Sequence, residues 1–407
     1  MLPEIKFLPV NWMDGMKVSD RHFIQQELSI ADRLRDYAAM GITSFNFGLL
    51  PPAPGVRSSF DLQFNVDQSK FIRVKLNECR AITPAGARIE ISSTHSKEVQ
   101  VYQSELEATF KIKSATTSQL DVVIIVNPFS RVPAGSPDPE ETPARYPYTL
   151  PECRLEIIPS EQVNQSEAAA FNITIGKINV VGEEITLDES FIPPCAFICS
   201  YKPLQDEFEA MRRQLFDIGT AAMMITQKIK SEPKKTELAN NILYLSEKVL
   251  SYLSIVIPQL RLTIEEAPPV MMFEKLSSLG YSISAAVNSM PDRDKEKMFN
   301  YFKQWIEMSQ SQFENAMMSV MSIEYNHLNI AKSLQASSRF VSVVARLFKQ
   351  LSKLKYIGEQ KDSGIVIGET IEPLRKAVGD SSETIRPAGP QQPDTKPPSK
   401  GWSFLND

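Results

Sequence analysis

Between residues 45 and 199, the apolar positions come in short runs separated by turn signals. Residues 71–76 alternate apolar and polar side chains, residues 83–86 read Thr-Pro-Ala-Gly, and the alternation resumes over residues 88–91. A period of two is typical of a strand with one buried face. Because no helical pattern separates the runs, they predict an antiparallel β-sandwich or barrel. Further strands are predicted at residues 99–102, 110–113, 121–126, 154–158 and 171–181, and a Pro-rich loop over residues 128–151.

A different period begins at Tyr201, where apolar residues start to recur at alternating intervals of four and three. This heptad spacing predicts helices that pack along their whole length, as in a helical bundle. The stripes can be buried within one chain or partly against other copies of it, and the spacing does not decide between these. The first stripe is Leu204, Phe208, Met211, Leu215, Ile218, Ala222, Ile225 and Ile229, the second is Leu238, Ile242, Leu245, Val249, Tyr252 and Val256, and further helices are predicted over residues 269–287, 292–325 and 329–354.

The apolar periodicity ends after Tyr356. Residues 387–400 are rich in proline, a composition that cannot bury a core and predicts disorder. Trp402, Phe404 and Leu405 follow, and they either fold back on their own domain or form a short docking peptide. We therefore expect an α+β protein of three parts: a β-sandwich over residues 1–199, a helical bundle over 200–356, and a reduced C-terminal segment with a Pro-rich tail over 357–407.

Composition narrows the class of protein. A chain of 407 residues with 42% hydrophobic and 23% charged residues has room for several domains. Its net charge of −5 does not favour nucleic acid, because binding to a phosphate backbone needs a concentrated basic face. The start lacks the pattern of a secretory leader, and the most apolar run, residues 249–257, contains serines and stops at Pro258. Four cysteines are too few for a disulfide scaffold, so a reducing cytoplasm is expected.

Candidate chemistry is sparse. The three histidines, His22, His95 and His327, form no zinc-binding pair, and no nucleophile elbow, phosphate loop or dinucleotide motif is present. Cys195 and Cys199 lie in an apolar segment without a second pair, which favours buried thiols over a metal site. His22 could be a ligand, although a hydrogen-bonding role in a folded turn fits better. We expect no enzyme activity, no cofactor, no metal and no small-molecule substrate.

The N-terminal block carries the most specific motif. Trp12 is followed by Asp14, Gly15 and Met16, and residues 22–26 read His-Phe-Ile-Gln-Gln. This combination resembles the opening of the TssK family, the baseplate proteins of bacterial type VI secretion systems. Residues 46–49, 79–86, 178–194 and 267–276 also resemble family stretches, and they occur in the family's order.

The resemblance implies a homotrimer with a β-sandwich shoulder like that of phage receptor-binding proteins, a helical neck and a C-terminal head. It implies a cytoplasmic position at the inner face of the inner membrane, where the shoulder binds a wedge of TssF-like and TssG-like proteins. In the family the head contacts the membrane complex, including TssL and TssM. Only residues 357–407 follow the predicted neck here, so the head is missing or reduced, as in a divergent system such as those of the Bacteroidetes, and a membrane-complex or adaptor protein would be contacted by the C-terminal segment. The residues expected to bind the baseplate partner are Phe7, Trp12, Asp14, Gly15, Met16, His22, Phe23, Gln25 and Gln26.

The N-terminal segment supports this reading without the family. Aromatic residues and methionine are common at the centres of interfaces, and Ile5, Leu8, Val10 and Met13 add apolar side chains between them. The alternative is a first strand and turn packed into the chain's own sandwich. Two other functions remain open: a phage-type tail or receptor-binding protein, and a carbohydrate-binding or enzymatic sandwich with carboxylates or exposed aromatic rings in a cleft.

Overall fold

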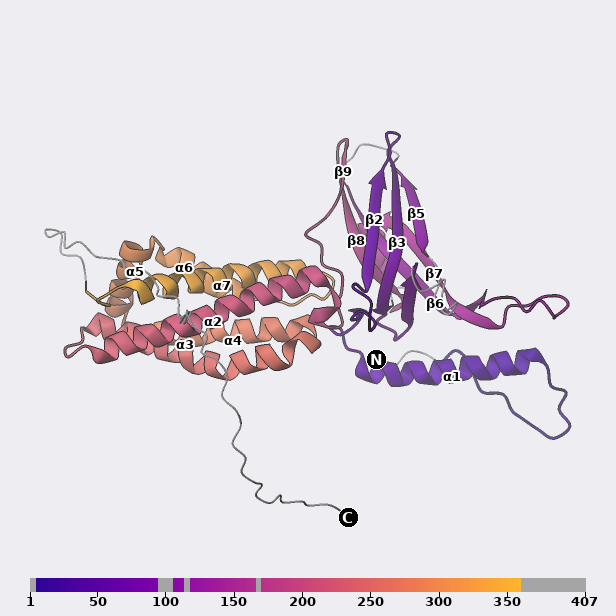
Figure 1. Cartoon of the computed structure of the whole chain (residues 1–407), viewed down its shortest axis with the longest axis horizontal. Coiled ribbons are helices and arrows are strands. Elements are labelled where there is room, and N and C mark those ends of the chain that lie inside the picture. Colours follow the sequence, from indigo (N-terminus) through magenta and orange to yellow (C-terminus); the bar gives the residue numbers. More distant parts are fainter. Residues whose placement is uncertain (1–4, 94–104, 113–117, 166–169, 360–407) are drawn as a thin grey trace, which may run out of the picture. The chain divides into compact units, whose positions relative to one another are not determined.

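The computed structural model describes residues 5–93, 105–112, 118–165 and 170–359. Within these residues, one helix comes first, two antiparallel sheets follow, and a bundle of helices comes last (Figure 1). The predicted α+β class, with antiparallel sheets before helices, is therefore confirmed. The predicted strand at residues 99–102 and the tail residues Trp402, Phe404 and Leu405 lie outside the described residues.

Helix α1 (Asp20–Gly41) was not predicted from the sequence. Its N-cap is Ser19, and the side chain of His22 accepts a hydrogen bond from the Ser19 backbone, which closes a capping box. Capping satisfies backbone N–H groups that the first helical turn leaves without partners. The N-terminal part is thus helical as well as β, and the alternative of a first strand is wrong, because residues 5–12 form no strand, although a turn follows at residues 14–15.

The first sheet is built around the long strand β3 (Phe71–Ile82). Its alternation buries Ile72, Val74 and Leu76 on one face, as a period of two requires. All pairings with β3 are antiparallel. The neighbouring strands are β1 (Gly48–Leu49), β2 (Phe60–Val66), β4 (Arg88–Ser92) and β5 (Leu106–Lys111).

The second sheet has the order β7-β6-β8-β9. It consists of β6 (Ser118–Ala134), β7 (Tyr148–Pro159), β8 (Asn172–Val181) and β9 (Glu184–Leu187), with the 3-10 turn η2 (Ser160–Gln165) after β7. The predicted loop over residues 128–151 is wrong at both ends, because pairing of β6 with β7 resumes at Arg131 opposite Pro151 after a register shift. Pro133 and Pro151 are tolerated because, among the described strands, none pairs with the outer edges of this extension of the ribbon.

In the described part of the chain, six helices form the bundle: α2 (Lys202–Ser231), α3 (Glu237–Leu262), α4 (Pro269–Asn288), α5 (Asp292–Ile306), α6 (Gln310–Met321) and α7 (Ile330–Lys353). Short 3-10 turns, η4 (Ile198–Ser200) and η5 (Ile264–Glu266), precede α2 and α4. Helix α2 packs against α3 and α7, and Figure 1 shows these long helices running side by side. The apolar run stops at Pro258, but the helix does not, since α3 continues through the proline to Leu262.

The predicted helix over residues 292–325 is broken in two. Helix α5 ends where Glu307 adopts the left-handed conformation at a φ of 54°. Ser309 then caps α6 by accepting a hydrogen bond from the backbone of Gln312, whose side chain accepts one from the Ser309 backbone. A Ser-x-x-Gln capping box starts a new helix, and its local hydrogen bonds outweigh the continuous apolar pattern that predicted a single one.

Candidate partner-binding surface

The N-terminal segment lies along α1 and is fastened to it by a buried carboxylate. Oδ2 of Asp32 accepts hydrogen bonds from the backbone N–H groups of Lys6 and Phe7, at 2.5 and 2.8 Å. Oδ1 of Asp32 forms an ion pair with Arg35 at 2.7 Å, and the two side chains are only 2% and 7% exposed. Hydrogen bonds to a charged acceptor are among the strong ones in proteins. The backbone of the segment is therefore held in a defined position on the helix.

Two glutamines of the predicted binding set continue this attachment. The Gln25 side chain donates to the carbonyl oxygen of Leu8 at 2.7 Å, and the Gln26 side chain accepts from the Val10 N–H at 3.2 Å. Both side chains bond to the extended segment of their own chain. Their role in this structure is to orient the segment.

Phe7 is half-buried and packs on β6. Its ring lies 5.1 Å from that of Phe129, measured between centroids. The ammonium group of Lys6 and the guanidinium group of Arg35 lie over the same Phe129 ring, at 5.5 and 5.6 Å. Cation–π contacts of this kind add to the burial of the ring. Phe7 thus anchors the segment to the sheet.

Trp12, His22 and Phe23 gather at the start of α1. The Trp12 ring lies 6.1 Å from each of the other two rings. Trp12 is 47% exposed and Phe23 is 62% exposed. We refer to Trp12, Met13 and Phe23 as the aromatic corner. Its side chains are apolar and accessible, and its backbone is held by the contacts described above.

The remaining members of the predicted set form a turn beside the corner. The Met16 N–H donates to the Met13 carbonyl oxygen at 3.2 Å, and Gly15 has a φ of 75°, in the left-handed region. Asp14 is exposed at the turn, and Met13 is 69% exposed. The structure thus splits the set into accessible residues and residues that hold the segment in place; Met13, which was not in the predicted set, is accessible as well.

The other stretches that carry the family resemblance meet at a junction between β1 and the helices. Leu49 N–H donates to the Pro194 carbonyl oxygen at 2.7 Å, and Ala196 N–H donates to the Leu49 carbonyl oxygen at 2.9 Å. The Ile198 N–H donates to the Ala267 carbonyl oxygen at 3.0 Å, just before α4. Segments that are far apart in the sequence are therefore joined by backbone hydrogen bonds.

His327 completes this junction from the loop between α6 and α7. Its Nε2 lies 2.8 Å from the carbonyl oxygen of Phe47, and its Nδ1 lies 2.6 Å from the Tyr325 hydroxyl. The carbonyl can only accept, so Nε2 carries the proton and Nδ1 accepts from the hydroxyl. The residue is 4% exposed, and burial lowers the pKa of His327 below its ordinary value.

Replacing His327 with glutamine should remove part of the pH dependence of stability. Because the folded-state pKa is lowered, the unfolded chain binds the extra proton first as the pH falls. The neutral histidine therefore supports the fold fully above its unfolded pKa of about 6.5, and the support is lost as the pH falls toward the folded pKa. Urea unfolding at about pH 7.5 and about pH 5 should show a smaller fall in unfolding free energy for the variant than for the wild type. An equal fall in both proteins would contradict this assignment.

The first heptad stripe faces the interior of the chain's own bundle. All eight of its residues are buried, and α2 packs on both α3 and α7. Of the second stripe, Tyr252 is half-buried, and its hydroxyl donates to the Lys275 carbonyl oxygen at 2.7 Å. Large apolar side chains remain exposed elsewhere on these helices, namely Phe216 and Met223 on α2 and Tyr244, Ile255 and Leu262 on α3.

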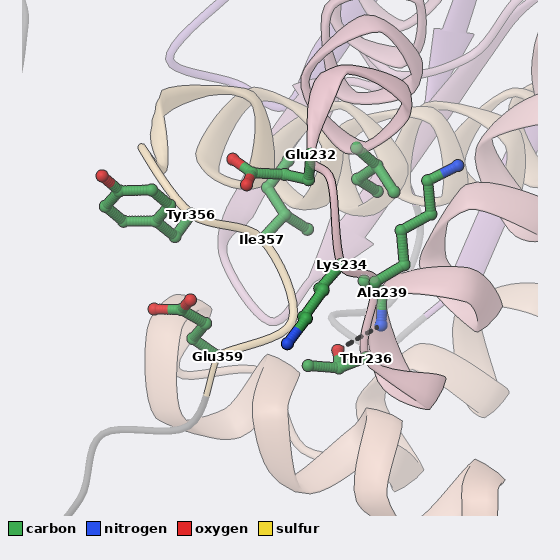
Figure 2. A pocket seen from close by; sticks show the side chains of 9 residues that line it. Glu232, Lys234, Thr236, Ala239, Tyr356, Ile357 and Glu359 are labelled. Carbon is green, nitrogen blue, oxygen red and sulfur yellow. Dashed lines mark hydrogen bonds between the residues drawn. The ribbon is translucent and has the colours of Figure 1, made fainter.

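Two cavities bear on the enzyme and carbohydrate alternatives. One lies at the end of the bundle between Thr236, Ile357 and Glu359 and has a volume of about 30 Å³ (Figure 2), room for about one or two waters. The other measures about 230 Å³ and is lined by Phe60, Phe191, Tyr201 and other apolar residues with Asp188 and Glu189 at its side. The Asp188 carboxylate already accepts hydrogen bonds from the Ser190 N–H and hydroxyl, at 3.0 and 2.6 Å.

The described part of the chain offers few candidate metal ligands that lie together. No group of three or more His, Cys, Asp or Glu side chains that could hold an ion occurs there. Cys195 is buried, its Sγ lies 3.1 Å from the Pro193 carbonyl oxygen, and burial raises the pKa of its thiol. Cys199 is partly exposed, and burial likewise raises its pKa. A protonated thiol is a poor ligand and nucleophile.

Sequence reasoning missed Asp32 and the outward side of α1. Asp32 bonds to residues 25 and 26 positions away, and such a contact leaves no periodic signal in the sequence. The outward side does have a signal, because Phe23, Ile30, Leu34 and Tyr37 are spaced by seven, four and three. That spacing predicts an apolar helical face but not which way it points. Among the described residues, no helix is both long and apolar enough to span a membrane.

Comparison with known proteins finds similarity among solved structures, whereas no family model and no curated protein matches. A crystal structure of TssK is 14% identical at a TM-score of 0.47, covering 82% of this chain and 68% of that chain. TssK from the EAEC type VI secretion system, in complex with a nanobody, is 13% identical at a TM-score of 0.46, covering 80% and 98%. TssK in a TssK-TssF-TssG baseplate subcomplex determined by cryo-electron microscopy is 13% identical at a TM-score of 0.44, covering 83% and 99%. The family named in these structures is the one that the N-terminal motif of this chain resembles.

Proposed function

We propose that this chain is a non-catalytic structural subunit of a type VI secretion baseplate. Its N-terminal segment would bind a wedge of TssF-like and TssG-like proteins at the inner face of the inner membrane. The observation that carries the proposal is the aromatic corner: Phe23 is exposed on α1, and Trp12 is exposed on the N-terminal segment, which Asp32, Gln25 and Gln26 fasten to that helix. A surface held in its binding conformation loses little entropy when a partner arrives.

The connector role rests on three parts, which we propose to be a shoulder over residues 1–199, a neck over 200–356 and a C-terminal segment over 357–407. Three copies joined at the neck would present three aromatic corners, so weak individual contacts would add up by multivalency. The first heptad stripe is buried within the chain. The neck contacts would therefore use other side chains, such as the exposed Phe216, Ile255 and Leu262.

Replacing Trp12 with aspartate should reduce recovery of the wedge proteins at least about tenfold, as loss of a central aromatic contact usually does. The tagged protein would be purified from its native host, and co-purifying proteins would be identified by mass spectrometry. Tyr281→Asp is the matched control, because Tyr281 is 60% exposed on α4, away from the corner. Unchanged recovery with Trp12→Asp, or equal losses with both variants, would contradict the proposed surface.

The same purification tests the C-terminal segment when a chain ending at Gln360 is compared with the full chain. Retention of TssF-like and TssG-like proteins by both would place wedge binding before residue 360. A protein lost only on truncation would be the membrane-complex or adaptor partner expected from Trp402, Phe404 and Leu405. If neither chain recovers baseplate proteins, a phage-type tail protein or a carbohydrate-binding sandwich takes precedence, and a glycan array would examine the latter.

A further inference from the structure

Helix α1 is amphipathic in the reverse sense of an ordinary surface helix. It buries Ser29, Asp32 and Arg35 and leaves large apolar side chains exposed. The exposed fractions are 62% for Phe23, 48% for Ile30, 62% for Leu34 and 73% for Tyr37. A helix of a soluble protein normally turns its apolar face inward. An outward apolar face therefore indicates a surface that a partner covers.

The exposed residues form a continuous seam with heptad spacing. Intervals of four and three run from one end of the helix to the other, which is the spacing of a seam between two packed helices. The seam is interrupted by a single acidic residue, Glu27, and ends at Gly41. We call this seam the outer stripe; it consists of Phe23, Glu27, Ile30, Leu34, Tyr37 and Gly41.

We propose that the outer stripe pairs with the outer stripe of a second copy of this chain, in the antiparallel direction. The stripe is self-complementary in that direction only. Phe23 then lies opposite the partner's Gly41, where a large ring meets a residue without a side chain. Ile30 lies opposite the partner's Leu34, and Glu27 lies opposite the partner's Tyr37. Each of these pairs occurs twice, as a twofold axis requires.

In a parallel pair with identical residues side by side, two of the layers would pack poorly. Two Glu27 carboxylates would face each other, and two Gly41 residues would leave an empty layer at the end of the helix. Like charges in one layer are destabilising, and voids forfeit packing energy. In the antiparallel direction the Glu27 carboxylate can accept a hydrogen bond from the partner's Tyr37 hydroxyl. Its charge is already balanced within its own chain, because Arg131 forms an ion pair with Glu27 at 3.0 Å.

The size of the contact predicts its strength. Helix α1 has 22 residues, so it is about 33 Å long. One helix pair with four large apolar side chains from each copy falls below the roughly 1,200 Å² of a standard stable interface. Pairing is therefore expected to be weak between isolated chains. It becomes effective between two assemblies that each carry several copies, since every pair after the first forms at a high local concentration.

Replacing Leu34 with glutamate tests the stripe directly. Leu34 occupies two of the layers in the pair, so two carboxylates would enter an apolar seam and weaken association at least about tenfold. Sedimentation velocity over a micromolar concentration series should show the wild type doubling its basal mass, whether that is one chain or three, while Leu34→Glu stays at the basal mass. Arg33→Ala is the control on the same helix, because Arg33 is exposed and lies outside the stripe. Equal doubling by wild type and Leu34→Glu would overturn the proposal.

Disulfide trapping separates the antiparallel pair from other arrangements. Phe23→Cys and Gly41→Cys chains, mixed and mildly oxidised, should form a cross-linked pair, whereas Phe23→Cys alone should not. Position 41 tolerates the change, because an added Cβ there meets no atom within 4 Å. Three native cysteines are buried, and unmodified protein controls for the partly exposed Cys199. Cross-linking of Phe23→Cys with itself, or none in the mixture, would contradict antiparallel pairing.

This contact is distinguishable from the proposed wedge surface, although Phe23 belongs to both. Leu34→Glu should abolish doubling and leave recovery of the wedge proteins unchanged. Trp12→Asp should do the opposite. Loss of both properties in Leu34→Glu with unaltered thermal unfolding would mean that the wedge protein covers the stripe, and the self-pairing proposal would fail.

Discussion

Replacing Gly48 with alanine is expected to lower the free energy of unfolding by at least about 4 kcal/mol, among the larger effects of a single substitution. Gly48 has a φ of 105°, which side chains other than that of glycine rarely adopt. An added Cβ would lie 2.0 Å from the carbonyl oxygen of Pro194 and 2.3 Å from its carbonyl carbon. These are backbone atoms that cannot rotate away, so β1 would have to leave the junction.

The matched control is Gly55→Ala. Gly55 also has a positive φ, 84°, but an added Cβ meets no atom within 4 Å. Its cost should be limited to backbone strain, about 1–2 kcal/mol. Urea unfolding of the two variants compares the clash with the strain. Similar losses would show that the close approach of Gly48 to Pro194 does not matter, and the junction would have to be weaker than its hydrogen bonds suggest.

Gly48 also illustrates which contacts can be predicted from the sequence and which cannot. Residues 46–49 and 178–194 were noticed because they resemble a family, and nothing in their composition indicated that they touch. The hydrogen bond between Leu49 and Pro194 spans more than a hundred residues of chain, and such contacts do not produce a period. The helices of the bundle were easier to predict, because residues such as Leu215 and Ile218 repeat with the period of the buried helical face.

The arrangement of the N-terminal residues was predicted in part, whereas their role in binding a partner stays a prediction. Trp12, His22 and Phe23 were grouped from the motif, and the structure brings their rings together. The motif could not distinguish the exposed residues of the aromatic corner from residues such as Gln25, which hold the N-terminal segment in place. Both kinds are polar or aromatic, and they are close in sequence. The orientation of helix α1 could not be predicted from its apolar spacing. Its polar side is buried by charge pairing around Asp32, which the usual inward apolar pattern does not anticipate.

The fold of the bundle should be lost when Leu215 and Ile218 are both replaced with aspartate. The two side chains are 2% and 1% exposed on α2. Each change removes a packed aliphatic side chain, at about 2–5 kcal/mol, and also places a carboxylate where water cannot reach it. The sum is comparable to the whole stability of a typical domain, about 5–15 kcal/mol.

The experiment on the double variant must distinguish a folded monomer from an unfolded chain. If the first stripe held copies of the chain together, the double variant would keep its helical circular dichroism and lose only its higher mass. Because the stripe is buried within one chain, we expect loss of helical signal and of a cooperative thermal transition. Phe216→Asp is the matched control, since Phe216 is the next residue after Leu215 and is 62% exposed. It should leave the fold intact, and if Phe216 lies in a neck contact between copies, it alone should lower the mass. If the double variant stayed folded and only its mass fell, the first stripe would have to lie at an interface between copies of the chain.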